Sequence, residues 1–197
     1  SRQVPGLAGG EAMTFNEPYN PLDKVHLGES VASALLKQEI RPLSSLPSFS
    51  GAGVYAIYYA GEFPLYRQIV QRHQEAEAGH PIYVGKAVPA GARKAGVGRD
   101  KNPGRVLSRR LREHLNSVEA AENLEATDFY YRFLLVDDIW IPLGESLMIA
   151  WYEPVWNTLV DGFGNHSQGR GRNLQRRSRW DVLHPGRDFA ARTADRG

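Results

Sequence analysis

Two short β-rich segments, residues 54–60 and 81–86, constrain the fold most, because only one helical segment, residues 65–78, separates them. The first follows Gly-Ala-Gly and is closed by Gly61, and its aromatic and aliphatic side chains favour a strand. The second begins at Pro81, which disfavours helix at the residue before it. Two strands joined through a short helix can pair antiparallel, so the sequence predicts a small, mainly antiparallel sheet.

Outside these segments the sequence predicts three more helices and one more strand. Leu107, Leu111 and Leu115 recur at every fourth position and mark the buried face of a helix. Pro142 near the start and Pro154 after the end bound the last long helix. Helices are predicted at residues 26–38, 104–116 and 142–152, a third strand at residues 127–136, and a connector at residues 41–53. The prediction is one small mixed α/β (α+β) domain with a three-stranded sheet flanked by helices.

The chain divides into three regions by composition. Residues 1–49 are expected to form an irregular N-terminal arm followed by a helix, and residues 50–160 the α/β core. Residues 161–197 are basic and rich in Gly and Arg, and we expect them to pack on that core as an extension. Trp180 and the apolar residues 182–183 are its expected anchors.

Composition argues against several classes of protein. No stretch approaches the roughly 20 apolar residues that span a bilayer, so neither a membrane-spanning protein nor a membrane partner is expected. The chain has no cysteine, which removes disulfides, thiol catalysis and thiolate metal sites together. The absence of cysteine fits an intracellular protein, and we expect a cytoplasmic one. The first residues lack the charged-then-apolar pattern of a secretory signal, while a leader trimmed before Ser1 is the open alternative.

The charge is distributed unevenly, although the net charge is only +2. Residues 86–112 carry nine Lys or Arg against one acid, and residues 166–187 carry six Arg against one acid. Between them, residues 113–164 carry ten acids against a single Arg. Two basic blocks beside an acidic body favour a surface that binds nucleic-acid phosphates, because each cation placed on DNA releases condensed counterions. A solvated charged surface is the alternative.

Each of the first two predicted strands contains a tyrosine within a short glycine-containing motif. Tyr55 ends the run Gly-Val-Tyr, and Tyr83 begins the run Tyr-Val-Gly, which Lys86 follows. The two tyrosines are 28 positions apart, with the predicted helix between them. Taken alone, a tyrosine in a strand is more often a packing residue, and Tyr58 and Tyr59 are assigned that role.

Four polar residues follow in the predicted helices and at the end of one of them. Arg110 and His114 are four positions apart and therefore share one helix face. Glu145 lies in the first turn of the last long helix, and Asn157 follows the end of that helix. Each has a structural alternative: a solvated helix face for the first pair, a charge that complements the helix dipole for Glu145, and a turn residue for Asn157. The combination of all these residues in one chain favours a catalytic site.

In this order, the motifs resemble those of the GIY-YIG nuclease superfamily. Within it, the chain is most similar to type II restriction endonucleases that cut GC-rich palindromes of the CCGCGG kind. Supporting runs are Pro-Ile-Tyr-Val-Gly-Lys at residues 81–86, Val-Trp-Asn at 155–157 and Val-Asp-Gly-Phe-Gly-Asn-His at 160–166, and the similarity covers residues 50–186. The spacing of 28 between the two tyrosines departs from most of the superfamily and resembles the restriction branch.

The resemblance implies a metal-assisted hydrolytic site. Glu145 is expected to hold Mg²⁺, or another divalent cation such as Mn²⁺, and Arg110 to bind the scissile phosphate. Tyr55 is the expected general base. A free tyrosine, with a pKa of about 10, is ionised only about one part in a thousand at neutral pH, so His114 or Lys86 is expected to assist it. Tyr55 as a nucleophile that forms a covalent phosphotyrosine is the open alternative.

The resemblance also implies supporting residues and partners. Tyr83 is expected to orient water or phosphate, and Asn157 to hold the Glu145 region by hydrogen bonding. The implied partner is double-stranded DNA bound by a homodimer inside the bacterial cell, with no nucleotide cofactor. Arginine suits guanine recognition, so DNA contacts are expected from the two basic segments. The candidates are Arg93, Lys94, Arg99, Lys101, Arg105, Arg170, Arg172, Arg176 and Arg177.

Other functional interpretations remain beside the restriction endonuclease. A structure-specific or homing nuclease of the same superfamily usually carries extra DNA-binding domains, and this chain has little room for a large one. A non-catalytic DNA-binding protein has no need of all the candidate catalytic residues. An RNA-binding module is more distant, because no RRM or KH signature occurs in the sequence.

Overall fold

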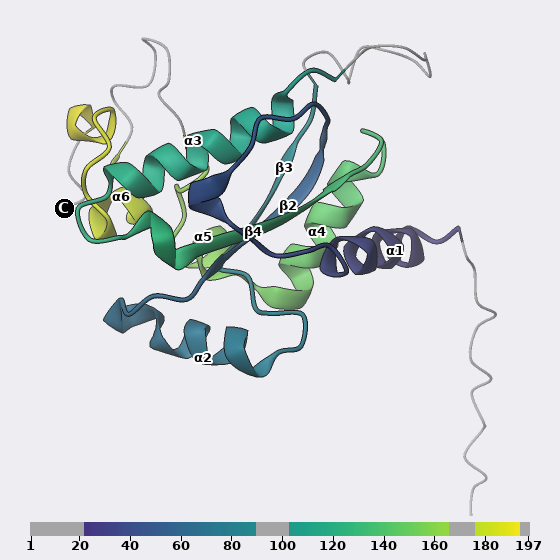
Figure 1. The fold of residues 1–197 in the computed structure, drawn as a ribbon, viewed down its shortest axis with the longest axis horizontal. Coiled ribbons are helices and arrows are strands. Elements are labelled where there is room, and N and C mark those ends of the chain that lie inside the picture. The colour runs from purple at the N-terminus through teal and green to yellow at the C-terminus, as the bar shows by residue number, and fades with distance from the viewer. Residues whose placement is uncertain (1–21, 90–102, 166–175, 194–197) are drawn as a thin grey trace, which may run out of the picture.

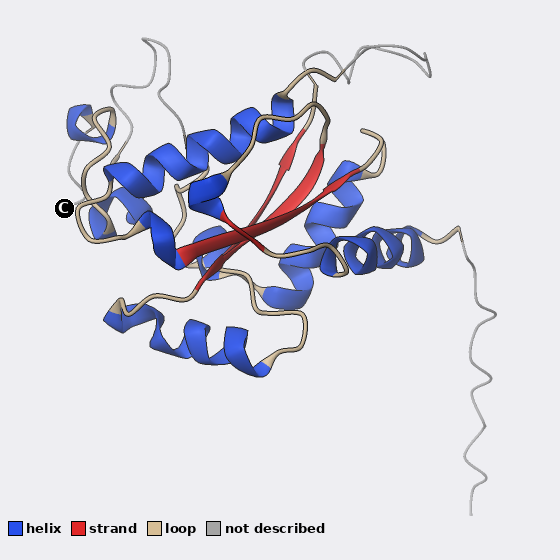
Figure 2. Cartoon of the chain, in the orientation of Figure 1, coloured by secondary structure: helices blue, strands red, loops and turns tan. Residues whose placement is uncertain are grey.

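The computed structural model describes residues 22–89, 103–165 and 176–193. Its centre is an antiparallel sheet in the order β1-β4-β2-β3, with helices on both sides (Figures 1 and 2). The strands are β1 (Arg41–Pro42), β2 (Gly53–Tyr59), β3 (Tyr83–Ala87) and β4 (Phe129–Leu135). The predicted mixed α/β class with an antiparallel sheet is confirmed, while the sheet has four strands among the described residues instead of the expected three.

The additional strand, β1, falls in the segment that was predicted to be a connector. It is two residues long and pairs with β4 through Arg41 opposite Tyr131 and Pro42 opposite Tyr130. A strand this short cannot develop the alternation of apolar and polar residues by which strands are recognised. Proline also restricts it to the edge of the sheet, because proline has no N–H to donate.

Strand β2 is central, and all seven of its residues are buried. It pairs with β3 on one side and with β4 on the other. Because successive side chains point to opposite faces, Tyr55, Ile57 and Tyr59 enter one core cluster, and Val54, Ala56 and Tyr58 enter a second. A strand buried on both faces explains why this run is almost continuously apolar or aromatic.

Helices cover the two faces of the sheet (Figure 1). Leu107, Leu111 and Leu115 of α3 are buried in the cluster around Tyr55, as their spacing predicted. Helices α1 and α4 pack against each other and cover the opposite face. The helices are α1 (Lys24–Leu36), α2 (Arg67–Glu75), α3 (Val106–Ala120), α4 (Ile141–Tyr152), α5 (Val155–Thr158) and α6 (Arg179–Leu183), with 3-10 turns η1 (Leu43–Ser45), η2 (Pro64–Tyr66), η3 (Ala126–Asp128) and η4 (Ala190–Arg192). None of the described helices is both long and apolar enough to cross a membrane.

The C-terminal segment packs on the face that α3 covers. Trp180 is fully buried and lies in the same cluster as Phe163 and Trp156. Val182 is 54% exposed, so its expected role as an anchor was wrong. It lies two residues from Trp180 on a short helix, and the two side chains point in different directions.

A chain of buried hydrogen bonds joins the C-terminal segment to the core. The His184 ring lies 2.8 Å from the side-chain oxygen of Asn123 through Nδ1 and 2.5 Å from the Tyr66 hydroxyl through Nε2. The indole of Trp156 donates to the same hydroxyl at 2.7 Å. A neutral His184 protonated on Nδ1 satisfies every one of these groups, and burial lowers its pKa to about 4.

We predict that acidification destabilises the protein through His184. The pKa is lowered from about 6.5 in the unfolded chain to about 4 in the folded protein. The contribution of neutral His184 to the free energy of unfolding is therefore fully present above pH 6.5 and is lost as the pH falls towards 4. Between about pH 7 and about pH 5 the loss is about 2 kcal/mol, measurable by urea unfolding. His184→Gln should remove this part of the pH dependence, and an unchanged slope in that variant would contradict the assignment.

Candidate active site

The pairing of β2 with β3 places two tyrosines over one glycine. Tyr55 lies opposite Gly85, and Tyr83, two residues before Gly85, points to the same face of the sheet. The centroids of the two phenol rings are 6.3 Å apart. A Cβ atom on Gly85 would lie 2.4 Å from the Tyr55 hydroxyl and 2.9 Å from the Tyr83 ring, so only glycine leaves room for both rings.

His114 reaches Tyr55 from helix α3. The buried leucines of that helix face the sheet, and His114 follows Leu111 by one turn on the same side. Its Nε2 lies 2.6 Å from the Tyr55 hydroxyl, and both side chains are fully buried. The His114 ring also meets Tyr83 nearly edge-on at 5.1 Å. This arrangement gives the phenolic proton of Tyr55 an acceptor inside the protein.

Arg110 lies one helical turn before His114 and faces the same site. Its guanidinium donates to the carbonyl oxygen of Gly164 at 2.9 Å and to the carboxylate of Glu113 at 3.2 Å. The side chain is 25% exposed, so Arg110 is the polar group of this cluster that reaches the surface. A planar guanidinium held in this way suits a phosphate group, which it can bind through two parallel hydrogen bonds.

A loop of the C-terminal region covers this cluster. The ring of Phe163 stacks on His114, with centroids 4.5 Å apart and planes at 18°, and meets Tyr83 edge-on at 5.0 Å. Phe163 is fully buried. Phe163 was not among the predicted site residues. The signal for it in the sequence is its place in the run at residues 160–166, which supports the family resemblance.

Glu145 approaches the sheet from the opposite layer, on α4. Its carboxylate lies 2.5 Å from the ammonium group of Lys86, with the two side chains 18% and 39% exposed. Lys86 directly follows Gly85 in β3 and so points away from the face that carries Tyr83. The sequence left His114 and Lys86 open as the partner of Tyr55. In the structure His114 contacts Tyr55, and Lys86 pairs with Glu145.

Asn157, on α5, binds the outer edge of β3. Its side-chain oxygen accepts from the Val84 N–H and its side-chain NH₂ donates to the Val84 carbonyl, both at 2.8 Å. The main-chain N–H of Trp156 donates to the carbonyl of Ile82, the residue before this strand, at 3.0 Å. Asn157 therefore holds the strand that carries Tyr83 and Lys86.

Burial raises the pKa of both phenols of this cluster. The pKa of Tyr55 is raised well above its usual value, first by burial and then by the neighbouring Tyr83. The pKa of Tyr83 is also raised, again mainly by burial. Arg110 opposes both shifts through its charge and hydrogen bonding, while the negative charge of Glu145 adds to them. Glu145 itself lies across the sheet from these hydroxyls, where it pairs with Lys86 of β3.

The carboxylate of Glu145 suits a divalent cation. Among residues 22–89, 103–165 and 176–193, no cluster of three or more His, Asp or Glu side chains forms a complete metal cage. Mg²⁺ commonly binds through one or two carboxylates and keeps several of its waters, so a single partly exposed carboxylate is compatible with it. Such an ion would share Glu145 with Lys86 or displace it.

The predicted DNA-contacting residues are placed only in part. Arg105 is exposed and immediately precedes α3. Arg176 is exposed, and Arg177 donates to the Ala190 carbonyl at 3.3 Å. The other candidates lie outside the described residues: Arg93, Lys94, Arg99, Lys101, Arg170 and Arg172.

Comparison with protein-family models relates the chain to a nuclease family. A family model described as the Eco29kI GIY-YIG domain matches residues 47–197. No curated protein matches the chain. The matched range begins before β2 and includes the C-terminal loop, so it contains every residue of the cluster described above.

We predict that Gly85→Ala separates Tyr55 from His114. The added methyl group would overlap the Tyr55 hydroxyl, and forcing the ring aside should cost about 1–3 kcal/mol of unfolding free energy. Gly28→Ala is the matched control, because its Cβ would meet nothing closer than 3.4 Å and it lies in a helix. Urea unfolding measures both variants. Equal stability of the two would contradict the described packing of Tyr55 over Gly85.

Proposed function

The chain belongs to the Eco29kI GIY-YIG family of restriction endonucleases and is a site-specific DNA nuclease, and we propose that it is a type II enzyme that hydrolyses double-stranded DNA at a GC-rich palindrome with a divalent metal ion. The observation that carries the proposal is the buried hydrogen bond between Tyr55 and His114. Arg110 lies on the same face of the sheet, and Glu145 pairs with Lys86 of β3 from the opposite layer. In the proposal these residues supply a proton acceptor, a phosphate-binding cation and a carboxylate for a metal ion.

Tyr55 acts in this proposal as a general base through a proton relay. Its pKa is raised, so a stable phenolate is disfavoured in the free protein. The attacking water gives a proton to the Tyr55 oxygen as the phenolic proton passes to His114 Nε2, which is 2.6 Å away. The new bond joins the water oxygen to phosphorus, and the bond from phosphorus to the leaving oxygen breaks. The proximity of His114 supports this relay over assistance by Lys86.

Arg110 binds the scissile phosphate and stabilises the charge on its oxygens. The Gly164 carbonyl and the Glu113 carboxylate hold its guanidinium in place before the substrate arrives. Tyr83, beside the same guanidinium, orients the phosphate or the attacking water through its hydroxyl.

A divalent cation, Mg²⁺ or Mn²⁺, is the proposed cofactor, and Glu145 is the residue that would hold it. When bound, it would polarise the phosphoryl oxygens and neutralise the charge that builds up on the leaving oxygen. Lys86 holds the Glu145 carboxylate at the edge of β3, and Asn157 holds the strand that carries Lys86.

The proposed DNA site is a palindrome rich in G·C pairs, cut by a homodimer on DNA. The support is the arginine content of the two basic segments, since arginine can bond guanine O6 and N7 together. A palindrome calls for two copies of the chain related by a two-fold axis, each cutting one strand.

Plasmid cleavage tests this proposal. The protein is incubated with plasmid DNA in Mg²⁺, in Mn²⁺ or in EDTA, and the ends of the products are sequenced. Discrete fragments that end at one GC palindrome only when metal is present are expected. Random nicking would favour a structure-specific or homing nuclease, and no cleavage with any divalent metal would overturn the proposal.

We predict that Tyr55→Phe and Glu145→Ala each slow cleavage by about 10²–10⁴-fold and change DNA affinity, measured in EDTA, by less than about threefold. Tyr58→Phe is the matched control, because it removes a buried hydroxyl from the same strand on the opposite face. It should cut at the wild-type rate.

A denaturing gel of the wild-type reaction distinguishes the two roles open to Tyr55. A base leaves no DNA joined to protein, whereas a nucleophile leaves a covalent phosphotyrosine. Near wild-type cleavage by either the Tyr55 or the Glu145 variant would show that these roles are wrong.

A further inference from the structure

The loop at residues 162–165 contacts the polar groups of the proposed active site. Phe163 stacks on His114, and the Gly164 carbonyl accepts from Arg110. A Cβ atom on Gly164 would lie 2.8 Å from the Tyr83 hydroxyl, so the backbone itself passes close over that phenol. The loop therefore contacts His114, Arg110 and Tyr83 together.

A single guanidinium binds this loop along its length. Arg187 donates to the carbonyl oxygens of Gly162 at 2.9 Å, Phe163 at 3.2 Å and Asn165 at 2.9 Å. These three carbonyls bracket Gly164, whose own carbonyl is left to accept from Arg110. Arg187 thus binds the carbonyl groups on both sides of Gly164.

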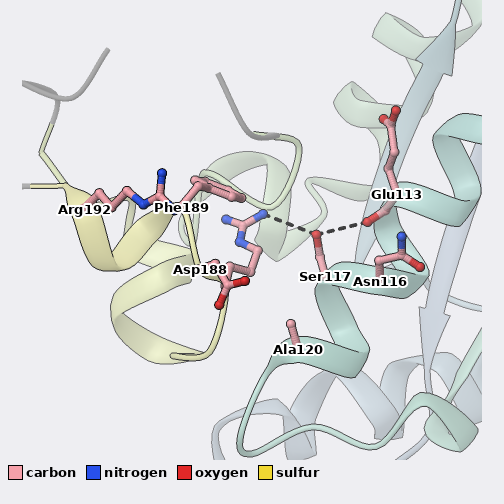
Figure 3. Close-up of a pocket in the computed structure, with 8 residues that line it drawn as sticks. Glu113, Asn116, Ser117, Ala120, Asp188, Phe189 and Arg192 are labelled. Atoms are coloured by element: carbon pink, nitrogen blue, oxygen red, sulfur yellow. Dashed lines mark hydrogen bonds between the residues drawn. The ribbon is translucent and has the colours of Figure 1, made fainter. Parts of the chain in front are cut away.

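The same guanidinium contacts helix α3. It lies 3.5 Å from the hydroxyl of Ser117, which in turn donates to the Glu113 carbonyl at 3.1 Å. Figure 3 shows Ser117 with these two bonds. The side chains lie at a pocket of about 600 Å³ that α3 and the C-terminal segment line. Ser117 follows His114 by one helical turn. Arg187 therefore ties the loop and the helix that carries His114 and Arg110 into one unit.

The surroundings of Arg187 hold its side chain in one orientation. Its Nε donates to the Asp181 carboxylate at 2.7 Å, and the two charged side chains are 3% and 4% exposed. The rings of Trp180 and Phe189 lie 4.3 Å and 4.7 Å from the guanidinium carbon. Hydrogen bonds to three carbonyls and one carboxylate require the planar guanidinium of arginine, which has five N–H donors. The lysine ammonium group has three donors on one nitrogen atom and cannot reach all four acceptors.

We infer that Arg187 is a positioning residue of the nuclease, which holds the loop at residues 162–165 so that Phe163 sets the His114 ring and Gly164 sets the Arg110 guanidinium. This inference rests on the proposed function of the site. It makes the C-terminal segment part of the catalytic machinery, although Arg187 itself touches neither Tyr55 nor Glu145 in the described contacts.

Arg187→Lys tests the inference, because it keeps the charge beside Asp181 and removes the fork that binds the loop. Arg132→Lys is the matched control. Arg132 is equally buried, donates to the main-chain carbonyls of Leu36 and Ala78, and lies over Tyr58 on the other face of the sheet. Both variants are compared at a temperature where circular dichroism shows them folded.

The expected result is a cleavage rate about 10- to 100-fold lower for Arg187→Lys, with DNA affinity in EDTA unchanged within about threefold. Arg132→Lys should cut within about twofold of the wild-type rate, even if its melting temperature falls as much as that of Arg187→Lys. Equal losses of cleavage in the two variants would assign the effect to general destabilisation and overturn the inference.

Hydrogen exchange in the free protein gives a readout that does not depend on cleavage. A peptide that contains residues 162–165 should exchange faster in Arg187→Lys than in the wild type or in Arg132→Lys. Unchanged exchange there would overturn the inference. If the wild type cuts no DNA but this peptide loosens only in Arg187→Lys, the proposed function fails while Arg187 is still shown to hold the loop.

Discussion

The hydrogen-bonded pairing of β2 with β3 places Tyr55 opposite Gly85, and the other groups of the site are arranged around that pair. A slip of one residue in this pairing would carry Tyr83 and Gly85 to the other face of the sheet. Tyr55 would then face a side chain in place of the open space over Gly85, and the approach of His114 to its hydroxyl would be blocked. The register is fixed because both faces of β2 are buried, so a slip would misplace two cores at once.

Much of this arrangement is predictable from the sequence, because it depends on local patterns. The leucine spacing gives α3 and its buried face, and therefore the side from which His114 approaches. The glycine-bounded aromatic run gives β2, and the family resemblance points to Tyr55 and Tyr83, on the first two predicted strands, as the candidate tyrosines. These features follow from periodicity and from residues close together in the chain.

Contacts between distant parts of the chain are not predictable in this way. The sequence left the partner of Tyr55 open, because the alternation of β3 sends Lys86 to Glu145 only once α4 has packed on that face. Phe163 and Arg187 look like ordinary members of an irregular Gly- and Arg-rich segment, and their contacts with His114 and with the loop arise from tertiary packing. Strand β1 is too short to carry any pattern.

Asn157 has a consequence for how copies of this protein can associate. The side-chain amide of Asn157 bonds the main-chain N–H and carbonyl of Val84, as a neighbouring strand would. Asn157 therefore blocks strand pairing at Val84 on the outer edge of β3. The opposite edge of the sheet is the two-residue β1, which contains a proline. Edges finished in this way discourage strands of other molecules from joining the sheet and so protect against aggregation. An assembly in which the sheet of one copy continues into that of another is therefore disfavoured at both edges.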